Sequence, residues 1–231
     1  MVDGHGESDR EVVVLADGLS LPGHLRVPAP AQGIVVFAHG SGSGRHSPRN
    51  RFVASVLNEA GLGTLLLDLL TPQEEANRVN VFDIELLADR LARATTWLRG
   101  QPEGADARIG WFGASTGAGA ALWAAAEPGA DVAAIVSRGG RPDLAGPRLA
   151  GVRAPTLFIV GGLDTAVLDL NEAARSRLHC ANELRVVPGA THLFEEPGTL
   201  EVAADLAQAW FVHHVRVKTT TSADKSWRRD G

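Results

Sequence analysis

Three residues of types that cooperate in nucleophilic catalysis each follow an apolar run in this chain. Ser115 is the centre of the sequence GASTG, Asp164 ends the sequence GGLD, and His192 lies in the sequence GATHLF. A serine hydroxyl is a weak nucleophile until a base accepts its proton, and that base needs an acid to orient it. The order serine, acid, histidine, each after a later strand, is one in which such sites are built. We therefore predict an acyl-transfer site with Ser115 as nucleophile, His192 as base and Asp164 as orienting acid.

The surroundings of Ser115 favour this interpretation over a plain glycine-rich turn. The serine directly follows an apolar strand-like run and opens a segment of small residues, 118–126, that reads as a helix. A sharp strand–serine–helix turn needs glycine on both sides because its backbone is strained and crowded. Alternatives remain for each residue taken alone. Asp164 could cap a helix, His192 could be an ordinary loop histidine, and Asp68 could replace Asp164 as the acid.

Such a site also needs backbone amides that face the oxygen on which negative charge develops. One amide is expected from Thr116, the residue after the nucleophile. The second is expected from Ser41, in the glycine-rich loop HGSGSG at 39–44 that follows the third strand-like run. That loop holds no GxGxxG pattern, so a dinucleotide-binding interpretation is not supported.

Several arginines are expected at the same edge of the molecule. Arg45 follows the glycine-rich loop, and Arg138 and Arg141 follow the sixth strand-like run. Guanidinium groups pair carboxylate and phosphate in a bidentate way, so we predict that these three residues bind an anionic or polar substrate. The alternative is that they pair with carboxylates of the chain itself, such as Asp143.

Short apolar runs alternate with amphipathic helical patterns along most of the chain, which predicts an α/β fold with right-handed crossovers. In such sheets ligands bind beyond the carboxyl ends of the strands, where the three residues are expected. Residues 1–10 and 218–231 are polar and aperiodic, so we predict two flexible ends around one domain, 11–217. The strand-like runs are Glu11–Leu15, His24–Val27, Ile34–Ala38, Thr64–Leu67, Ile109–Phe112, Val132–Val136, Thr156–Val160 and Leu184–Val187.

Composition excludes several classes of function. A net charge of −5 argues against a general binder of nucleic acid or of anionic membranes. The single cysteine, Cys180, excludes an intrachain disulfide and cysteine-rich metal sites, and no GxxxxGK[ST] loop is present. The polar first residues and the lack of a long apolar run predict a soluble, cytoplasmic protein. The predicted chemistry requires neither a metal nor an organic cofactor.

The four motifs HGSGSG, GASTG, GGLD and GATHLF make residues 11–215 resemble the α/β-hydrolase superfamily, within it the dienelactone hydrolase-like branch. The resemblance implies a three-layer α/β/α sandwich around a mostly parallel eight-stranded sheet whose second strand is antiparallel. The connection 137–155 is too short for the helical cap that many relatives insert there, so no cap domain is expected. Dienelactone hydrolases proper carry cysteine where this chain has Ser115, so dienelactone as substrate does not carry over.

The activity that these observations predict is cleavage of a small carboxylic ester or lactone through an acyl-enzyme. Two alternatives stay open: an acyltransferase or perhydrolase that uses the same residues, and a non-catalytic domain that partners another enzyme. Some domains similar to this one are fused to phosphoribosyltransferase domains. A phosphoribosyltransferase and a second copy of the chain are therefore the partners to consider.

Overall fold

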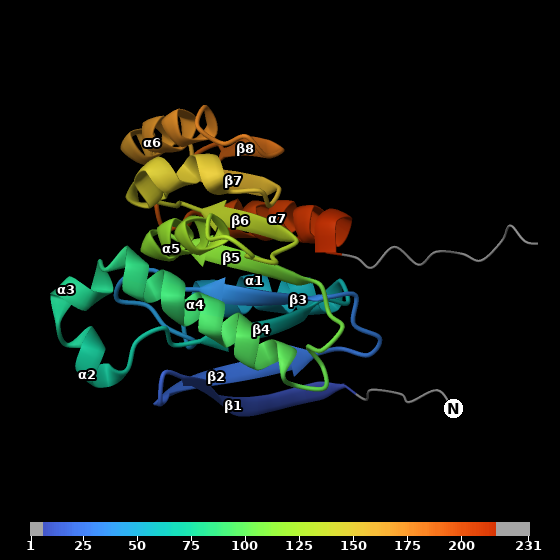
Figure 1. Cartoon of the computed structure of the whole chain (residues 1–231). Helices are drawn as coiled ribbons and strands as arrows, with labels where there is room; N and C mark the ends of the chain where they lie inside the picture. The colour runs from blue at the N-terminus through green and yellow to red at the C-terminus, as the bar shows by residue number, and fades with distance from the viewer. Residues whose placement is uncertain (1–6, 216–231) are drawn as a thin grey trace, which may run out of the picture.

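The computed structural model describes residues 7–215, which form one α/β domain around an eight-stranded sheet (Figure 1). The strands are β1 (Ser8–Ala16), β2 (Leu19–Val27), β3 (Ile34–Ala38), β4 (Gly63–Leu67), β5 (Ile109–Ala114), β6 (Ala134–Arg138), β7 (Thr156–Gly161) and β8 (Asn182–Val187). The helices are α1 (Pro48–Glu59), α2 (Pro72–Glu75), α3 (Arg78–Val81), α4 (Ile84–Arg99), α5 (Thr116–Ala125), α6 (Thr165–Arg175) and α7 (Thr199–Val215), with a 3-10 segment η1 (Pro142–Gly151).

The strand order across the sheet is β1-β2-β4-β3-β5-β6-β7-β8. β2 pairs antiparallel with β1 and β4, and every pair from β4–β3 to β7–β8 is parallel. Strands β3 to β7 are buried along their whole length, as expected where helices cover both faces of a sheet. The mostly parallel eight-stranded sheet, with its second strand antiparallel, is thus confirmed.

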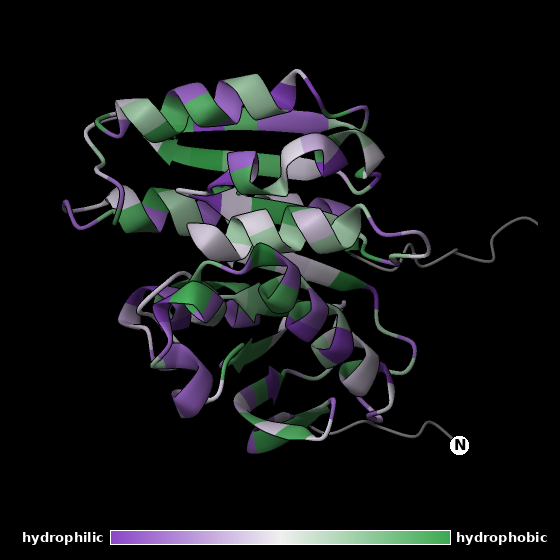
Figure 2. Ribbon diagram, turned by 60° about the vertical axis from the view of Figure 1, so that its left-hand side comes forward, coloured by the Kyte–Doolittle hydropathy of each residue, from purple (hydrophilic) through white to green (hydrophobic). Residues whose placement is uncertain are grey.

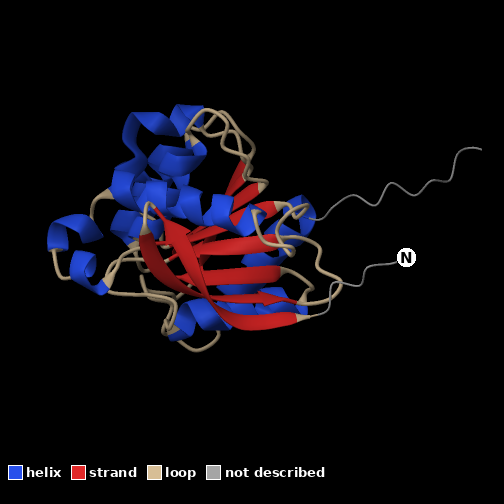
Figure 3. Ribbon diagram, turned by 60° about the horizontal axis from the view of Figure 1, so that its bottom comes forward, coloured by secondary structure: helices blue, strands red, loops and turns tan. Residues whose placement is uncertain are grey.

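Helices cover both faces of the sheet (Figure 3). Two apolar cores, one on each face, hold the layers together. One core contains residues of α4, α5 and α6, and the other contains residues of α1 and α7. The strands between the layers are mostly apolar, whereas the helices mix polar and apolar residues (Figure 2). This arrangement is the predicted three-layer sandwich.

Within the described range, no helical cap covers the edge where the parallel strands end. The connection between β6 and β7 holds only η1. The short helices α2 and α3 follow β4 in the chain and lie beyond one end of α4 (Figure 1). Helix α2 has a sequence signal of its own at its first turn. The Thr71 hydroxyl accepts a hydrogen bond from the Glu74 amide, and the Glu74 carboxylate accepts one from the Thr71 amide, which is a capping box.

Most strands are longer than the predicted runs; β2, for example, begins at Leu19 and not at His24. Two of the differences, at β1 and β6, have a clear cause. β1 begins at Ser8, so residues 8–10 are strand and not part of the flexible N-terminus, because pairing with β2 continues to Ser8 opposite Val27. β6 runs over Ala134–Arg138 and not over 132–136, because its polar last residues still pair with β5 and β7.

The predicted tail 218–231 lies outside the described residues. Within residues 7–215 no helix combines the length and the apolar character that crossing a membrane requires.

Candidate active site

Ser115 occupies a strained turn between β5 and α5. Its backbone has φ 51° and ψ −119°, a conformation that residues other than glycine rarely adopt. The flanking glycines are needed for close packing: a Cβ on Gly117 would lie 2.1 Å from the Ala38 carbonyl oxygen, and one on Gly113 would lie 2.4 Å from the Cα of Ala118. The turn therefore places the serine directly at the N-terminus of α5, where the helix dipole favours negative charge.

The turn after β6 holds the strained backbone of Ser115. The Ser115 amide donates to the Arg138 carbonyl at 3.2 Å, and the Ser115 carbonyl accepts from the Arg141 amide at 3.0 Å. Buried Asn171 of α6 in turn donates to the Gly140 carbonyl at 3.0 Å. The sequence does not predict this support, because backbone hydrogen bonds between loops leave no pattern in the residue types.

Asp164 and His192 meet at the ends of β7 and β8. The Nδ1 atom of His192 lies 2.6 Å from Oδ2 of Asp164, so a proton on Nδ1 is donated to the carboxylate. The two loops are joined by the Leu163 amide, which donates to the Ala190 carbonyl at 2.9 Å. Because Nδ1 carries the proton, Nε2 of His192 is left as the basic nitrogen. The pair predicted from the order of the motifs is thus in contact.

The loop that carries His192 is anchored on both sides. The Glu196 carboxylate accepts from the Thr191 amide at 3.0 Å, and that hydrogen bond lowers the pKa of Glu196. Phe194 is buried with φ 56°, and Glu195 pairs with Arg49 of α1. Gly139, in the turn after β6, lies against the His192 ring, since a Cβ there would be 3.5 Å from it. Among residues 7–215 no hydrogen bond joins the Ser115 hydroxyl to His192. Such contacts often tighten only when substrate binds.

The two predicted oxyanion donors lie side by side. Thr116 is the first residue of α5, so its amide has no acceptor within the helix. The Ser41 amide donates to the Thr116 hydroxyl at 3.0 Å, so it becomes available to a ligand only when that hydroxyl turns away. Ser41 also lines a cavity of about 650 Å³ between the glycine-rich loop and the segment after β4. This cavity is large enough for a small ligand.

His39 braces the glycine-rich loop from the interior of the protein. Its Nε2 accepts from the Leu69 amide at 3.0 Å, so Nδ1 carries the proton that is donated to the Gly40 carbonyl at 2.9 Å. Burial lowers the pKa of His39, because the charged ring would lose its hydration. The folded protein therefore keeps the ring neutral.

This lowered pKa predicts a loss of stability in mild acid. Below the unfolded value of 6.5 the unfolded chain binds a proton that the folded chain resists, so the stability from His39 is complete above pH 6.5 and declines as the pH falls towards the folded pKa. We expect the Tm of the wild type to fall more steeply between pH 7.5 and 5 than that of His39→Asn, which keeps a donor for Gly40 but does not titrate. Parallel Tm curves for the two proteins would contradict this.

The three arginines predicted to bind substrate differ in their partners. Arg141 forms a bidentate pair with Asp143, at 2.8 and 2.7 Å, which raises the pKa of Arg141. Arg45 pairs with Asp68, which also accepts the Arg45 amide at 2.7 Å. The Asp68 carboxylate therefore already has Arg45 as its partner, whereas Asp164 contacts His192. This favours Asp164 as the orienting acid. Of the three, only Arg138 lacks a carboxylate partner among residues 7–215.

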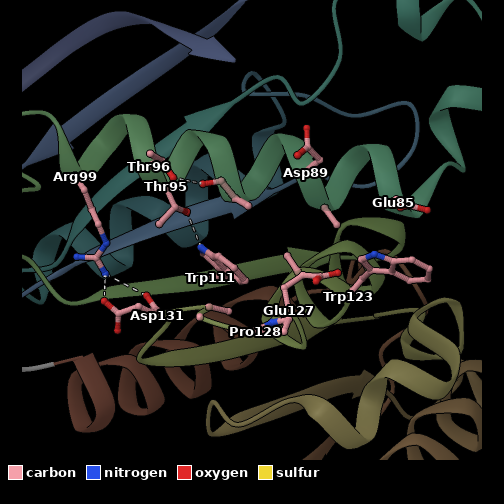
Figure 4. Close-up of a pocket in the computed structure, with 15 residues that line it drawn as sticks. Glu85, Asp89, Thr95, Thr96, Arg99, Trp111, Trp123, Glu127, Pro128 and Asp131 are labelled. Carbon is pink, nitrogen blue, oxygen red and sulfur yellow. Dashed lines mark hydrogen bonds and ion pairs between the residues drawn. The ribbon is translucent and has the colours of Figure 1, made fainter. Parts of the chain in front are cut away.

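A second depression, of about 500 Å³, lies between α4 and α5 (Figure 4). Figure 4 shows Trp111 and Trp123 on its wall, Trp111 donating to Thr95 at 2.9 Å and Arg99 paired with Asp131. It contains none of the residues predicted to do chemistry.

Within the described part of the chain no group of three or more histidine, cysteine, aspartate or glutamate side chains is placed to hold a metal ion.

Comparison with known proteins gives one matching family. Residues 26–220 match the model of the dienelactone hydrolase family. Two proteins of Mycobacterium tuberculosis, from strains H37Rv and CDC 1551, bear the name phosphoribosyl transferase and are each 63% identical to the chain over 207 residues. The matched part is 90% of this chain and 47% of each relative, so the chain spans about half the length of these curated relatives.

Solved structures share the fold. A dienelactone hydrolase from Anabaena variabilis has 53% identity and a TM-score of 0.88, with 92% of this chain and 100% of that chain covered. Est1E from Butyrivibrio proteoclasticus has 15% identity and a TM-score of 0.76, with 88% of this chain and 98% of that chain covered. The second likeness concerns the fold alone.

Proposed function

Because the chain belongs to the dienelactone hydrolase family and has the α/β-hydrolase fold, we propose that it is a serine hydrolase that cleaves a small carboxylic ester or lactone. The observation that carries the proposal is the 2.6 Å contact between His192 and Asp164 at the sheet edge where the strained Ser115 turn also lies. A strained turn of this kind costs about 1–3 kcal/mol, and such strain is typical of functional sites.

The proposed reaction has two steps. In the first, Nε2 of His192 accepts the Ser115 proton while the Ser115 oxygen bonds to the ester carbonyl carbon, and the proton then passes to the leaving alcohol. In the second, His192 takes a proton from water, whose oxygen attacks the acyl-enzyme and releases the acid, and Ser115 regains its proton. Asp164 fixes the tautomer of His192 and stabilises the imidazolium.

The charge that develops on the carbonyl oxygen is proposed to be held by the Thr116 and Ser41 amides. The Thr116 hydroxyl, which accepts the Ser41 amide at 3.0 Å, is then exchanged for the substrate oxygen. The helix dipole of α5 adds to the attraction, because the oxygen lies at the N-terminus of the helix.

Labelling with a fluorophosphonate tests whether Ser115 is an activated nucleophile. We expect intact-mass spectrometry to find a single adduct on the wild type, none on Ser115→Ala, and slow formation on His192→Ala. Esters, thioesters and lactones would then be compared as substrates, and an added alcohol or peroxide would separate hydrolysis from acyl transfer. Absence of an adduct on folded wild-type protein would rule out the proposed nucleophile.

A second candidate function is a non-catalytic hydrolase-like domain that partners a phosphoribosyl transferase. It is favoured by the 63% identity to relatives of that name, of whose length the chain covers 47%. Under this proposal a Ser115→Ala variant should still complement a deletion in the native host, and a phosphoribosyl transferase should co-purify with the chain. Failure of the variant to complement would favour the hydrolase.

A further inference from the structure

Asn171 is a polar residue within the apolar stripe of α6. The buried residues of this helix are Val167, Asn171 and Ala174, and Asn171 is fully buried. A buried amide costs free energy unless its groups are hydrogen-bonded, whereas an apolar side chain would add to the core without that cost. The presence of an amide at this position therefore needs an explanation other than packing.

The side chain of Asn171 joins α6 to the turn after β6. Its Nδ2 group donates to the Gly140 carbonyl at 3.0 Å and to the Val167 carbonyl at 2.7 Å. Val167 belongs to α6 itself, so the bond to Gly140 is the one that links two separate parts of the chain. A hydrogen bond of this kind to a buried carbonyl is costly to lose, because the carbonyl is then left without a donor.

The turn after β6 contacts both the proposed nucleophile and the proposed base. The Ser115 amide donates to the Arg138 carbonyl, and the Ser115 carbonyl accepts from the Arg141 amide. Between these two residues, a Cβ on Gly139 would lie 3.2 Å from the His192 carbonyl oxygen and 3.5 Å from Nδ1 and Cε1 of its ring. A displacement of this turn would therefore change the position of Ser115 relative to His192.

The proposed acid stands at the start of the same helix. Asp164 is the residue that precedes the first turn of α6, and its carbonyl accepts the Leu168 amide at 2.9 Å. The helix is held by its own backbone hydrogen bonds, so it keeps the distance between Asp164 and Asn171 constant. One helix thus connects the loop of the acid with the turn that contacts the nucleophile and the base.

We propose that Asn171 is a positioning residue, which sets the position of Ser115 relative to His192 by anchoring the turn after β6 to α6. The inference rests on the proposed function. Both hydrogen bonds of the Asn171 amide go to backbone carbonyls, so the residue acts through the backbone and not on the substrate. Such an anchor matters because a misplacement of about 1 Å, even when it originates far from the reacting atoms, can slow a reaction about 100-fold.

The first test compares the wild type with Asn171→Leu, whose side chain is also branched but has no N–H group. We expect fluorophosphonate labelling of Ser115 to slow about 100-fold in the folded variant, the scale of a misplaced reacting group. With a neutral aryl ester the loss should appear in kcat and not in KM, because no group that binds the substrate has been removed. If Asn171→Leu does not fold, Asn171→Ala removes the same hydrogen bond without added volume. Labelling of the folded variant at the wild-type rate would overturn the proposal.

The matched control is Asn58→Leu. Asn58 of α1 also donates its side-chain amide to a loop carbonyl, that of Leu62 at 2.9 Å, and to the Thr64 hydroxyl at 3.1 Å. Leu62 precedes β4 and so lies at the edge of the sheet opposite to Ser115, which follows the parallel strand β5. Asn58→Leu should lower the Tm, because a carbonyl loses its donor, and should leave the labelling rate unchanged. An equal loss of labelling in both variants would assign the effect to general destabilisation and refute a specific role of Asn171.

Nuclear magnetic resonance gives a readout that does not depend on catalysis. The Nδ1 proton of His192, in its 2.6 Å contact with Asp164, should give a resonance far downfield in the wild type. Because Gly139 faces Nδ1, this resonance should shift or broaden in Asn171→Leu and stay in place in Asn58→Leu. If the wild type were not labelled by the fluorophosphonate, the proposed hydrolase would fail. A resonance that moved only in Asn171→Leu would then leave the positioning role standing, whereas an unchanged resonance would end it as well.

Discussion

Replacing Asp164 with asparagine is expected to lower kcat for ester hydrolysis by about four orders of magnitude while the protein stays folded, as the same change does in a serine protease triad. The reason is the 2.6 Å contact between Asp164 and Nδ1 of His192. An amide is neutral and can present its NH₂ group to Nδ1, which moves the ring proton to Nε2. His192 can then no longer accept the Ser115 proton, and the imidazolium that forms in the reaction loses its counter-charge.

The matched control is Asp68→Asn, since Asp68 is the carboxylate that the sequence left as an alternative acid. Asp68 follows β4, which is separated by β3 from β5, the strand that precedes Ser115. Its carboxylate pairs with Arg45. We expect its substitution to change kcat by less than about tenfold, the scale of a group outside the proton relay. Steady-state kinetics with a neutral aryl ester compare the two. If Asp68→Asn were the inactive variant, the assignment of Asp164 would have to be abandoned.

The sequence predicts the arrangement of the candidate site because the topology of a parallel sheet is restrictive. Ser115, Asp164 and His192 each follow a strand, and parallel strands end at one edge, so their order in the chain is enough to bring their loops together. The glycines around Ser115 also carry direct information, since Gly113 and Gly117 stand where a Cβ would collide with backbone. Both features depend on the geometry of the backbone, which short sequence motifs and their order along the chain specify.

The arginines could not be sorted from sequence in the same way. Whether Arg45, Arg138 or Arg141 is paired depends on side-chain conformation and on neighbours far along the chain, such as Asp68 for Arg45. Arg138 looks like a loop residue after an apolar run, yet pairing with Ala114 and Ile159 extends β6 to include it. Its burial therefore appears only in the structure.

Replacing Ser115 with glycine is expected to abolish hydrolysis and at the same time to stabilise the protein. Loss of the nucleophile lowers kcat by about a million-fold in a comparable triad. The stability gain follows from the backbone, since φ 51° and ψ −119° cost a residue with a Cβ about 1–3 kcal/mol, whereas glycine adopts them freely.

Ser115→Ala separates the two effects, because alanine also lacks the hydroxyl but keeps the strained Cβ. Glycine loses about 0.5–1 kcal/mol more backbone entropy on folding, so the net advantage of Ser115→Gly over Ser115→Ala is about 1 kcal/mol. For a domain of this size that corresponds to a Tm difference of about 2–4 °C. Equal Tm values for the two inactive variants would show that the strain of the turn is no larger than the entropy cost of glycine, about 0.5–1 kcal/mol. A higher Tm for glycine alone would show that the fold sacrifices stability to hold an oxygen nucleophile at the N-terminus of α5.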